Sequence, residues 1–184
     1  REVGIPVYIS NSPRSVKEVK QRVMKLAQLV GEEEKGQDIL VRMEERLRQV
    51  EKKLASITPE KRKCCMAFDF TGVIGSKNNL LADIFEYAHL RNGALQNQKG
   101  SIQGENRLSK EQIVVVNPDI FMLPTWNYDG RSGVADYYQQ IMTDPALQHV
   151  NAVRNNQVKM VSDRYRYVSS HHVVESIEVF AKTA

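Results

Sequence analysis

The sequence is poor in the residues on which disulfide-rich and metal-binding proteins depend. Its only two cysteines, Cys64 and Cys65, are adjacent. In a strand such neighbours face opposite ways, so a disulfide between them would be strained. The neighbouring histidines His171 and His172 diverge by about 100° on a helix, which excludes the i, i+4 pair of a zinc helix. We therefore expect two small buried thiols, no metal site and no cofactor.

Long apolar runs are also missing. No run reaches the ~20 residues that a membrane-spanning helix needs. There is no signal-peptide pattern, because Val3 to Ile9 is short and contains Gly4 and Pro6. The chain opens on Arg1 and not on methionine, so we expect its natural N-terminus to lie upstream.

Catalytic and phosphate-binding motifs are absent as well. The chain has no Gly-x-Ser-x-Gly elbow, no Gly-x-x-x-x-Gly-Lys loop and no Gly-x-Gly-x-x-Gly turn. Its net charge of +4 arises in residues 1–62, where charges alternate in sign as on a solvated helix face. These absences favour a binding protein over an enzyme and argue against nucleic-acid binding.

The pattern of the N-terminal third predicts a short strand at Val3 to Ser10, followed by two helices. Ser15 with Glu18 forms a capping-box pattern, and Gly31 stands where a helix ends, so a helix is predicted from residue 15 to about residue 30. A second helix is predicted over 32–56, with an apolar stripe from Leu40 to Ile57 and an i, i+4 pair of Glu44 with Arg48. The stripe also suits a coiled coil, but packing on a following domain explains it without a partner chain.

After residue 62 strands and helices alternate. Strands are predicted at 64–70, 120–123 and 158–161, and helices at 79–90, from Lys110, at 134–142, at Asp144-Pro145 and after Ser170. This order predicts an α/β fold with a mainly parallel sheet flanked by helices, a Rossmann-like three-layer lobe preceded by a long helical segment. We place a connector and long helix in residues 1–62 and the α/β lobe in residues 63–184.

Ligands of such sheets bind beyond the carboxyl ends of the strands. The loops at 71–76, with Phe70 leading in, at 124–133 and at 162–169 contain aromatic and arginine side chains there, which suit a flat, partly apolar, anionic ligand. Equally, loop aromatics can simply cover a sheet edge. The candidate ligand-binding residues are Phe70, Thr71, Trp126, Tyr128, Arg131, Arg164, Tyr165 and Arg166.

The stretch Leu108 to Leu123 predicts a short helix that leads into a buried strand. Ser109 and Gln112 form a capping box, and Asn117-Pro118-Asp119 ends the helix before an apolar run. Glu111 lies in the first turn, where unpaired N–H groups favour a carboxylate. By local sequence alone it is an ordinary surface acid that stabilises the helix dipole.

The chain resembles the C-terminal part of the bacterial ABC-transporter solute-binding proteins for iron-siderophore, haem and cobalamin ligands, whose two lobes are joined by a long backbone helix. The resemblance rests on four segments in the expected order. They are Gly4-Ile5-Pro6-Val7, Leu29-Val30-Gly31-Glu32-Glu33 with the helix after it, Leu108 to Ile120, and Asn151 to Val158.

The resemblance implies a periplasmic or extracellular monomer, free or lipid-anchored, that delivers an iron complex such as a siderophore or haem to the transmembrane subunits of an ABC permease. A corrinoid such as cobalamin is the alternative ligand. It also implies that Glu111 docks onto permease arginines, and that an N-terminal lobe of the same protein, absent from this sequence, forms the other wall of the cleft. An enzyme on a related scaffold and a coiled-coil interaction protein are the readings from other classes.

Overall fold

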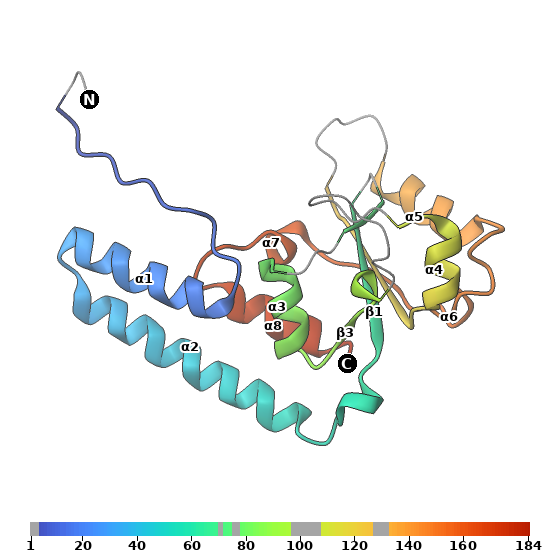
Figure 1. Ribbon diagram of the computed structural model, residues 1–184, viewed down its shortest axis with the longest axis horizontal. Coiled ribbons are helices and arrows are strands. Elements are labelled where there is room, and N and C mark those ends of the chain that lie inside the picture. The colour runs from blue at the N-terminus through green and yellow to red at the C-terminus, as the bar shows by residue number, and fades with distance from the viewer. Residues whose placement is uncertain (1–3, 70–71, 75–77, 97–107, 127–132) are drawn as a thin grey trace.

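The computed structural model describes residues 4–69, 72–74, 78–96, 108–126 and 133–184. Two antiparallel helices stand at one end of the molecule, and an α/β layer structure forms the rest (Figure 1). Within the described residues, no helix is both long enough and apolar enough to cross a membrane. The predicted fold class, an α/β lobe preceded by a long helical segment, is confirmed.

The two N-terminal helices are α1 (Val16–Val30) and α2 (Glu33–Leu54). The Ser15 side chain accepts a hydrogen bond from the Glu18 amide, and Gly31 ends α1 with a left-handed φ of 69°, as the sequence predicts. The stripe of α2 is buried within this chain, which confirms packing on the following domain. The predicted Glu44–Arg48 pair is wrong, because Glu44 instead binds Lys20 of α1 and Arg48 binds Glu45.

The sheet has the strand order β2-β1-β4-β5, with β3 beside the start of β1. Strands β3, β1, β4 and β5 are parallel, and β2 runs antiparallel to β1. The strands are β1 (Cys64–Asp69), β2 (Gly72–Ile74), β3 (Arg91–Asn92), β4 (Ile120–Leu123) and β5 (Val158–Met160).

Helices cover both faces of the sheet, and α1 and α2 add a further layer beyond α3 and α8 (Figure 1). The remaining helices are α3 (Leu80–Tyr87), α4 (Lys110–Val116), α5 (Val134–Thr143), α6 (Asn151–Arg154), α7 (Asp163–Arg166) and α8 (Val173–Ala181). Two 3-10 turns are η1 (Pro59–Lys61) and η2 (Gly93–Leu95).

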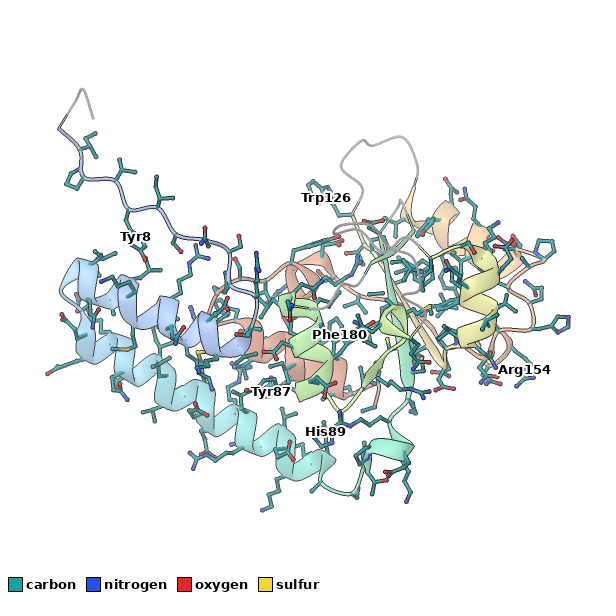
Figure 2. The ribbon with its side chains drawn as sticks, in the orientation of Figure 1. Tyr8, Tyr87, His89, Trp126, Arg154 and Phe180 are labelled. Carbon is teal, nitrogen blue, oxygen red and sulfur yellow. The ribbon has the colours of Figure 1, made fainter. Side chains whose placement is uncertain are left out.

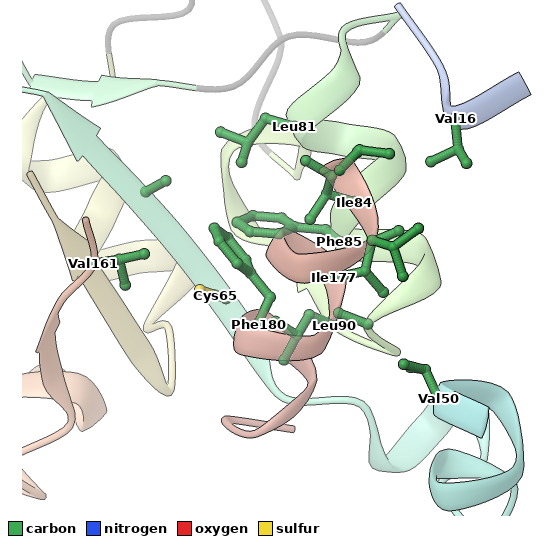
Figure 3. Close-up of a cluster of buried hydrophobic side chains, with 14 of the residues drawn as sticks. Val16, Val50, Cys65, Leu81, Ile84, Phe85, Leu90, Val161, Ile177 and Phe180 are labelled. Carbon is green, nitrogen blue, oxygen red and sulfur yellow. The ribbon is translucent and has the colours of Figure 1, made fainter. Parts of the chain in front are cut away.

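The strand alternation divides the core into two clusters. Cys65 and Ala67 of β1 join a cluster with α1, α2, α3 and α8, whereas Met66 and Phe68 join one with α4, α5 and α6. Figure 3 shows the first cluster, in which Phe180 of α8 lies against helix α3 and strand β1. Both cysteines are buried and unpaired, as expected. The division into domains at residue 62 stays a prediction, since the first cluster draws side chains from both sides of it.

Several predicted elements differ from the structure. Residues 4–10 form no strand but an exposed extended segment, because they have no neighbouring strand to bond. The loop predicted over 71–76 contains β2, and the loop predicted over 162–169 contains helix α7. At Asp144-Pro145 the chain makes turns, with the Asp144 carboxylate accepting from the Ala146 amide, and the short helix α6 begins only at Asn151.

The Asn117-Pro118-Asp119 break joins three elements. Asn117 takes a left-handed conformation with φ 48°, and its side-chain oxygen accepts from the Asn151 amide at 2.8 Å. One Asp119 oxygen accepts from the Cys64 amide at 2.8 Å at the start of β1. The break therefore holds the amino ends of β1 and β4 and the start of α6 in a fixed arrangement. The positions of the strands at their other, carboxyl ends follow from this arrangement.

Candidate ligand-binding site

The carboxyl ends of the three central parallel strands meet at one edge of the sheet. β1 ends at Asp69, β4 at Leu123 and β5 at Met160, in paired register. The chain after β4 is described as far as Trp126, and the chain after β5 is described throughout. Phe70, Thr71, Tyr128 and Arg131 lie outside the described residues, so their roles stay predictions.

Asp163 links the segments that follow β4 and β5. One of its carboxylate oxygens accepts from the Thr125 amide at 2.9 Å and from the Thr125 hydroxyl at 3.1 Å. The Asp163 amide in turn donates to the Thr125 hydroxyl at 3.3 Å. These bonds fix Trp126, the next residue, relative to helix α7.

Arg166 has a structural role at this edge. Its side chain is buried, and it binds the second Asp163 oxygen at 3.0 Å and donates to the Phe68 carbonyl of β1. A buried guanidinium needs such partners because its desolvation is costly. Arg166 was predicted as a ligand contact, but with no exposed side-chain surface it acts here by joining α7 to β1.

Tyr137 of helix α5 also binds the chain at the carboxyl edge of the sheet. Its hydroxyl donates to the Asp69 carbonyl at 2.8 Å, and burial together with the charge of Asp69 raises the pKa of Tyr137 to about 12. The roles of Tyr137, Asp163 and Thr125 were not predicted from the sequence. The signal for Asp163 was its place directly after β5, whereas nothing local distinguished Tyr137 from its neighbour Tyr138.

Three predicted residues offer surface to a ligand. Trp126 is 56% exposed and stands at the carboxyl edge of the sheet, as Figure 2 shows. Arg164 is also exposed, with its guanidinium carbon 4.7 Å from the centre of the Tyr165 ring, and it forms an ion pair with Glu175 at 3.2 Å. Tyr165 itself is half-buried against the first core cluster. The structure thus places an indole, a guanidinium and a phenol ring near one edge.

Glu111 lies in the first turn of α4, the helix that precedes strand β4. The capping box of Ser109 and Gln112 is fully formed, with the Gln112 side chain accepting from the Ser109 amide at 2.8 Å. The hydrogen bond from the Ser109 hydroxyl holds the pKa of Glu111 below its ordinary value, and the residue is exposed. Glu111 is therefore an ionised surface carboxylate held in a defined position.

Among the described residues, no group of three or more His, Cys, Asp or Glu side chains is placed to hold a metal ion. The guanidinium of Arg164 and the rings of Trp126 and Tyr165 suit recognition of an organic or chelated ligand through ring stacking and charge.

Comparison with known proteins agrees with this architecture. Residues 1–165 match the sequence model of a family described as periplasmic binding protein. A search of curated proteins found no match.

Three solved structures of similar fold illustrate the likeness. The periplasmic heme-binding protein RhuT from Roseiflexus sp. RS-1, in apo form, is 18% identical with a TM-score of 0.79, over 99% of this chain and 67% of that one. A possible iron-binding periplasmic solute-binding protein from Staphylococcus epidermidis is 17% identical with a TM-score of 0.78, over 99% and 67%. Helicobacter pylori CeuE with Ni(II) bound is 19% identical with a TM-score of 0.78, over 97% and 54%.

At these identities the solved structures establish the fold, and this chain spans about half to two thirds of their length. The sequence model, in contrast, covers most of this chain. The chain therefore belongs to the periplasmic binding protein family.

Proposed function

We propose that this chain is part of the solute-binding component of an ABC importer, which binds an iron complex such as a siderophore or haem and delivers it to a membrane permease. The observation that supports this most is the family match over residues 1–165. Solved proteins of the same fold are described as heme-binding and iron-binding. A corrinoid such as cobalamin is the alternative ligand.

The proposed ligand wall is the carboxyl edge of the sheet. Trp126 and Tyr165 supply ring surface for a flat macrocycle or an aromatic chelator, and Arg164 supplies charge for an anionic group. The predicted contacts Phe70, Thr71, Tyr128 and Arg131 belong to the same proposal. An N-terminal lobe of the same protein would form the opposite wall, so we expect this chain alone to bind weakly.

The proposed permease-docking surface is the outer face of α4. Glu111, Val114 and Val115 follow one another at helical spacing on this face, and Val115 is 75% exposed. Lys110 is held by Asp144 at 2.6 Å, which partly neutralises that cation and leaves Glu111 as the acid of this face. An ionised carboxylate beside exposed valines suits a partner that presents arginines with an apolar surround.

This function places the protein on the outer side of the cytoplasmic membrane, in the periplasm or outside the cell, free or attached by a lipid anchor. We propose that it acts as a monomer and that its ligand leaves chemically unchanged. Recovery of an altered ligand after incubation would favour an enzyme instead.

Ligand titration tests the proposal. Trp126 is the only tryptophan, so its fluorescence reports on the carboxyl edge. We expect saturable quenching by haem, a ferric siderophore or cobalamin at up to high-micromolar concentrations, after correction with free N-acetyltryptophanamide. No saturable response to any of the three would refute the proposal.

A matched pair of variants controls for unspecific adsorption of the ligand. Arg164→Gln removes a cation at the carboxyl edge, and Arg154→Gln removes an exposed cation before β5, at the opposite edge of the sheet (Figure 2). Specific binding weakens only in Arg164→Gln, whereas adsorption to a cationic surface weakens equally in both.

A further inference from the structure

A pocket of about 200 Å³ opens between α7 and the start of α8. It is lined by Arg164, Tyr165, Val168, Ser170, His172 and Glu175. Four of these six residues, Val168, Ser170, His172 and Glu175, were not predicted as ligand contacts, and they come from the connection between α7 and α8 and from the first turn of α8. The pocket is large enough for a carboxylate and a short stem but not for a whole iron chelate.

Glu175 organises the polar side of this pocket. One of its oxygens binds Arg164 Nη2 at 3.2 Å, and the other binds His172 Nδ1 at 2.7 Å. The hydrogen bond with His172 and the one from Arg164 lower the pKa of Glu175. The carboxylate thereby holds a guanidinium and an imidazole side by side.

Arg164 keeps capacity for a second anion. Its side chain is 66% exposed, and the hydrogen bond described to Glu175 uses one nitrogen of a guanidinium that has five N–H donors. The Tyr165 ring beneath it, at 4.7 Å, limits the orientations of the planar fork. A pre-oriented guanidinium loses less conformational entropy when it binds a carboxylate.

Two histidine rings lie side by side next to the pocket. The ring centre of His171 lies 4.1 Å from that of His172. Burial lowers the pKa of His171, and the charges of His172 and Arg42 lower it further, whereas the charge of Glu175 opposes the shift. Of the residues that line the pocket, Arg164 carries a positive charge and Glu175 a negative one, and Arg164 keeps N–H donors that Glu175 does not use. These donors suit an anion, while Tyr165 and Val168 offer apolar surface to its stem.

We infer that this pocket binds a carboxylate arm of the transported ligand, so the ligand class is an iron complex with a free carboxylate. The inference rests on the proposed function. Arg164 is the anchoring residue. Glu175 is a positioning residue that orients Arg164 and also offsets part of its charge.

Two matched ligand pairs test the inference. Haem is compared with haem dimethyl ester, which lacks free carboxylates, and ferric citrate with ferrioxamine, whose iron is bound by hydroxamates. Binding is measured by Trp126 quenching and, for the haems, by the absorbance of the porphyrin. We expect the carboxylate member of at least one pair to bind about 10-fold tighter, as for a charge-assisted hydrogen bond.

Three variants assign the effect to the pocket. Arg164→Gln should remove the preference for the carboxylate member, and Arg154→Gln should keep it. Glu175→Gln keeps an oxygen that accepts from Arg164 but removes the opposing charge, so it should tighten carboxylate binding several-fold. A merely structural role of Glu175 would weaken binding instead.

The outcomes separate this inference from the proposed function. Equal affinity within each pair, with binding present, overturns the inference and leaves the importer role intact. A carboxylate preference that survives in Arg164→Gln also overturns it. Failure of all four complexes and of cobalamin to bind would overturn the proposed function, and the inference with it.

Discussion

The crossing of α1 and α2 depends on a glycine, and replacing Gly36 with alanine is expected to disturb it. A Cβ atom at Gly36 would lie 2.5 Å from the Cβ of Ala27 and 3.2 Å from the sulfur of Met24. Carbon atoms in favourable contact are about 3.5–4.0 Å apart. The two helices must therefore move apart by roughly an ångström, or their side chains must leave their preferred positions.

Two opposing terms set the size of the effect. Overpacking of a buried position costs about 1–3 kcal/mol, whereas alanine in a helix interior is favoured over glycine by about 0.5–1 kcal/mol. We expect Gly36→Ala to lower the free energy of unfolding by up to ~2 kcal/mol. Because the propensity gain obscures the clash, the single variant is not a sufficient test.

A double-mutant cycle isolates the clash. Ala27→Gly removes the facing methyl, so in the double variant the new Cβ has room, and the helix-propensity terms cancel in the coupling energy. We expect a coupling of about 1–3 kcal/mol, equal to the overpacking cost. Urea unfolding followed by far-ultraviolet circular dichroism measures it. A coupling below ~0.5 kcal/mol would show that the helices do not touch at Gly36.

Three further predictions concern other parts of the chain. Glu111→Lys should weaken ligand-dependent stimulation of the partner permease's ATPase and leave ligand affinity unchanged; a parallel loss of affinity would rule out a docking role. Burial raises the pKa of Cys64 to about 11 and that of Cys65 well above its ordinary value, so neither thiol should react with Ellman's reagent at pH 8 until urea unfolds the chain, and prompt reaction in the folded state would contradict the burial. Bonding to Arg46 lowers the pKa of Glu178, so the pair stabilises the fold above the ordinary carboxylate pKa and loses its contribution as pH falls through the lowered value. Glu178→Gln should therefore cost about 0.5–1 kcal/mol at pH 7 and progressively less in acid, and a loss that does not depend on pH would exclude the ionic mechanism.

Most of the fold could be predicted because its signals are local. Ser15, Ser109 and Gly31 mark helix ends through backbone bonds within one turn, and each prediction is confirmed. The apolar stripe of α2 likewise predicted side chains that are buried in the core. Patterns of this kind depend on chemistry within a few residues, so one sequence is sufficient.

Predictions failed where a residue's state depends on a distant partner. Leu26 and Val30 repeat at helical spacing with the buried Val16 and Val19, yet they are 45% and 70% exposed, because α1 extends beyond the lobe that covers Val16 and Val19. Strand β2 was read as loop because its three residues become a strand only by bonding β1. No local pattern contains this information.

At the candidate site, too, local signals predicted part of the structure and contacts with distant residues decided the rest. Its location at the carboxyl edge followed from the strand order alone, since parallel strands bring those ends together. The roles of the arginines there did not follow. Arg164 and Arg166 are two residues apart and were predicted alike, yet one is exposed beside Glu175 and the other is buried against β1.

The sequence by itself determined the longer helices, the main parallel strands, the layer order and the edge at which a ligand should bind, because these depend on periodicity, capping and chain order. The tertiary structure decided which side chains at that edge are available. It joined Asp163 to Thr125, buried Arg166, and brought Ser170, His172 and Glu175 to Arg164. The physical reason is that desolvation and ion pairing act between atoms close in space, whatever their separation along the chain.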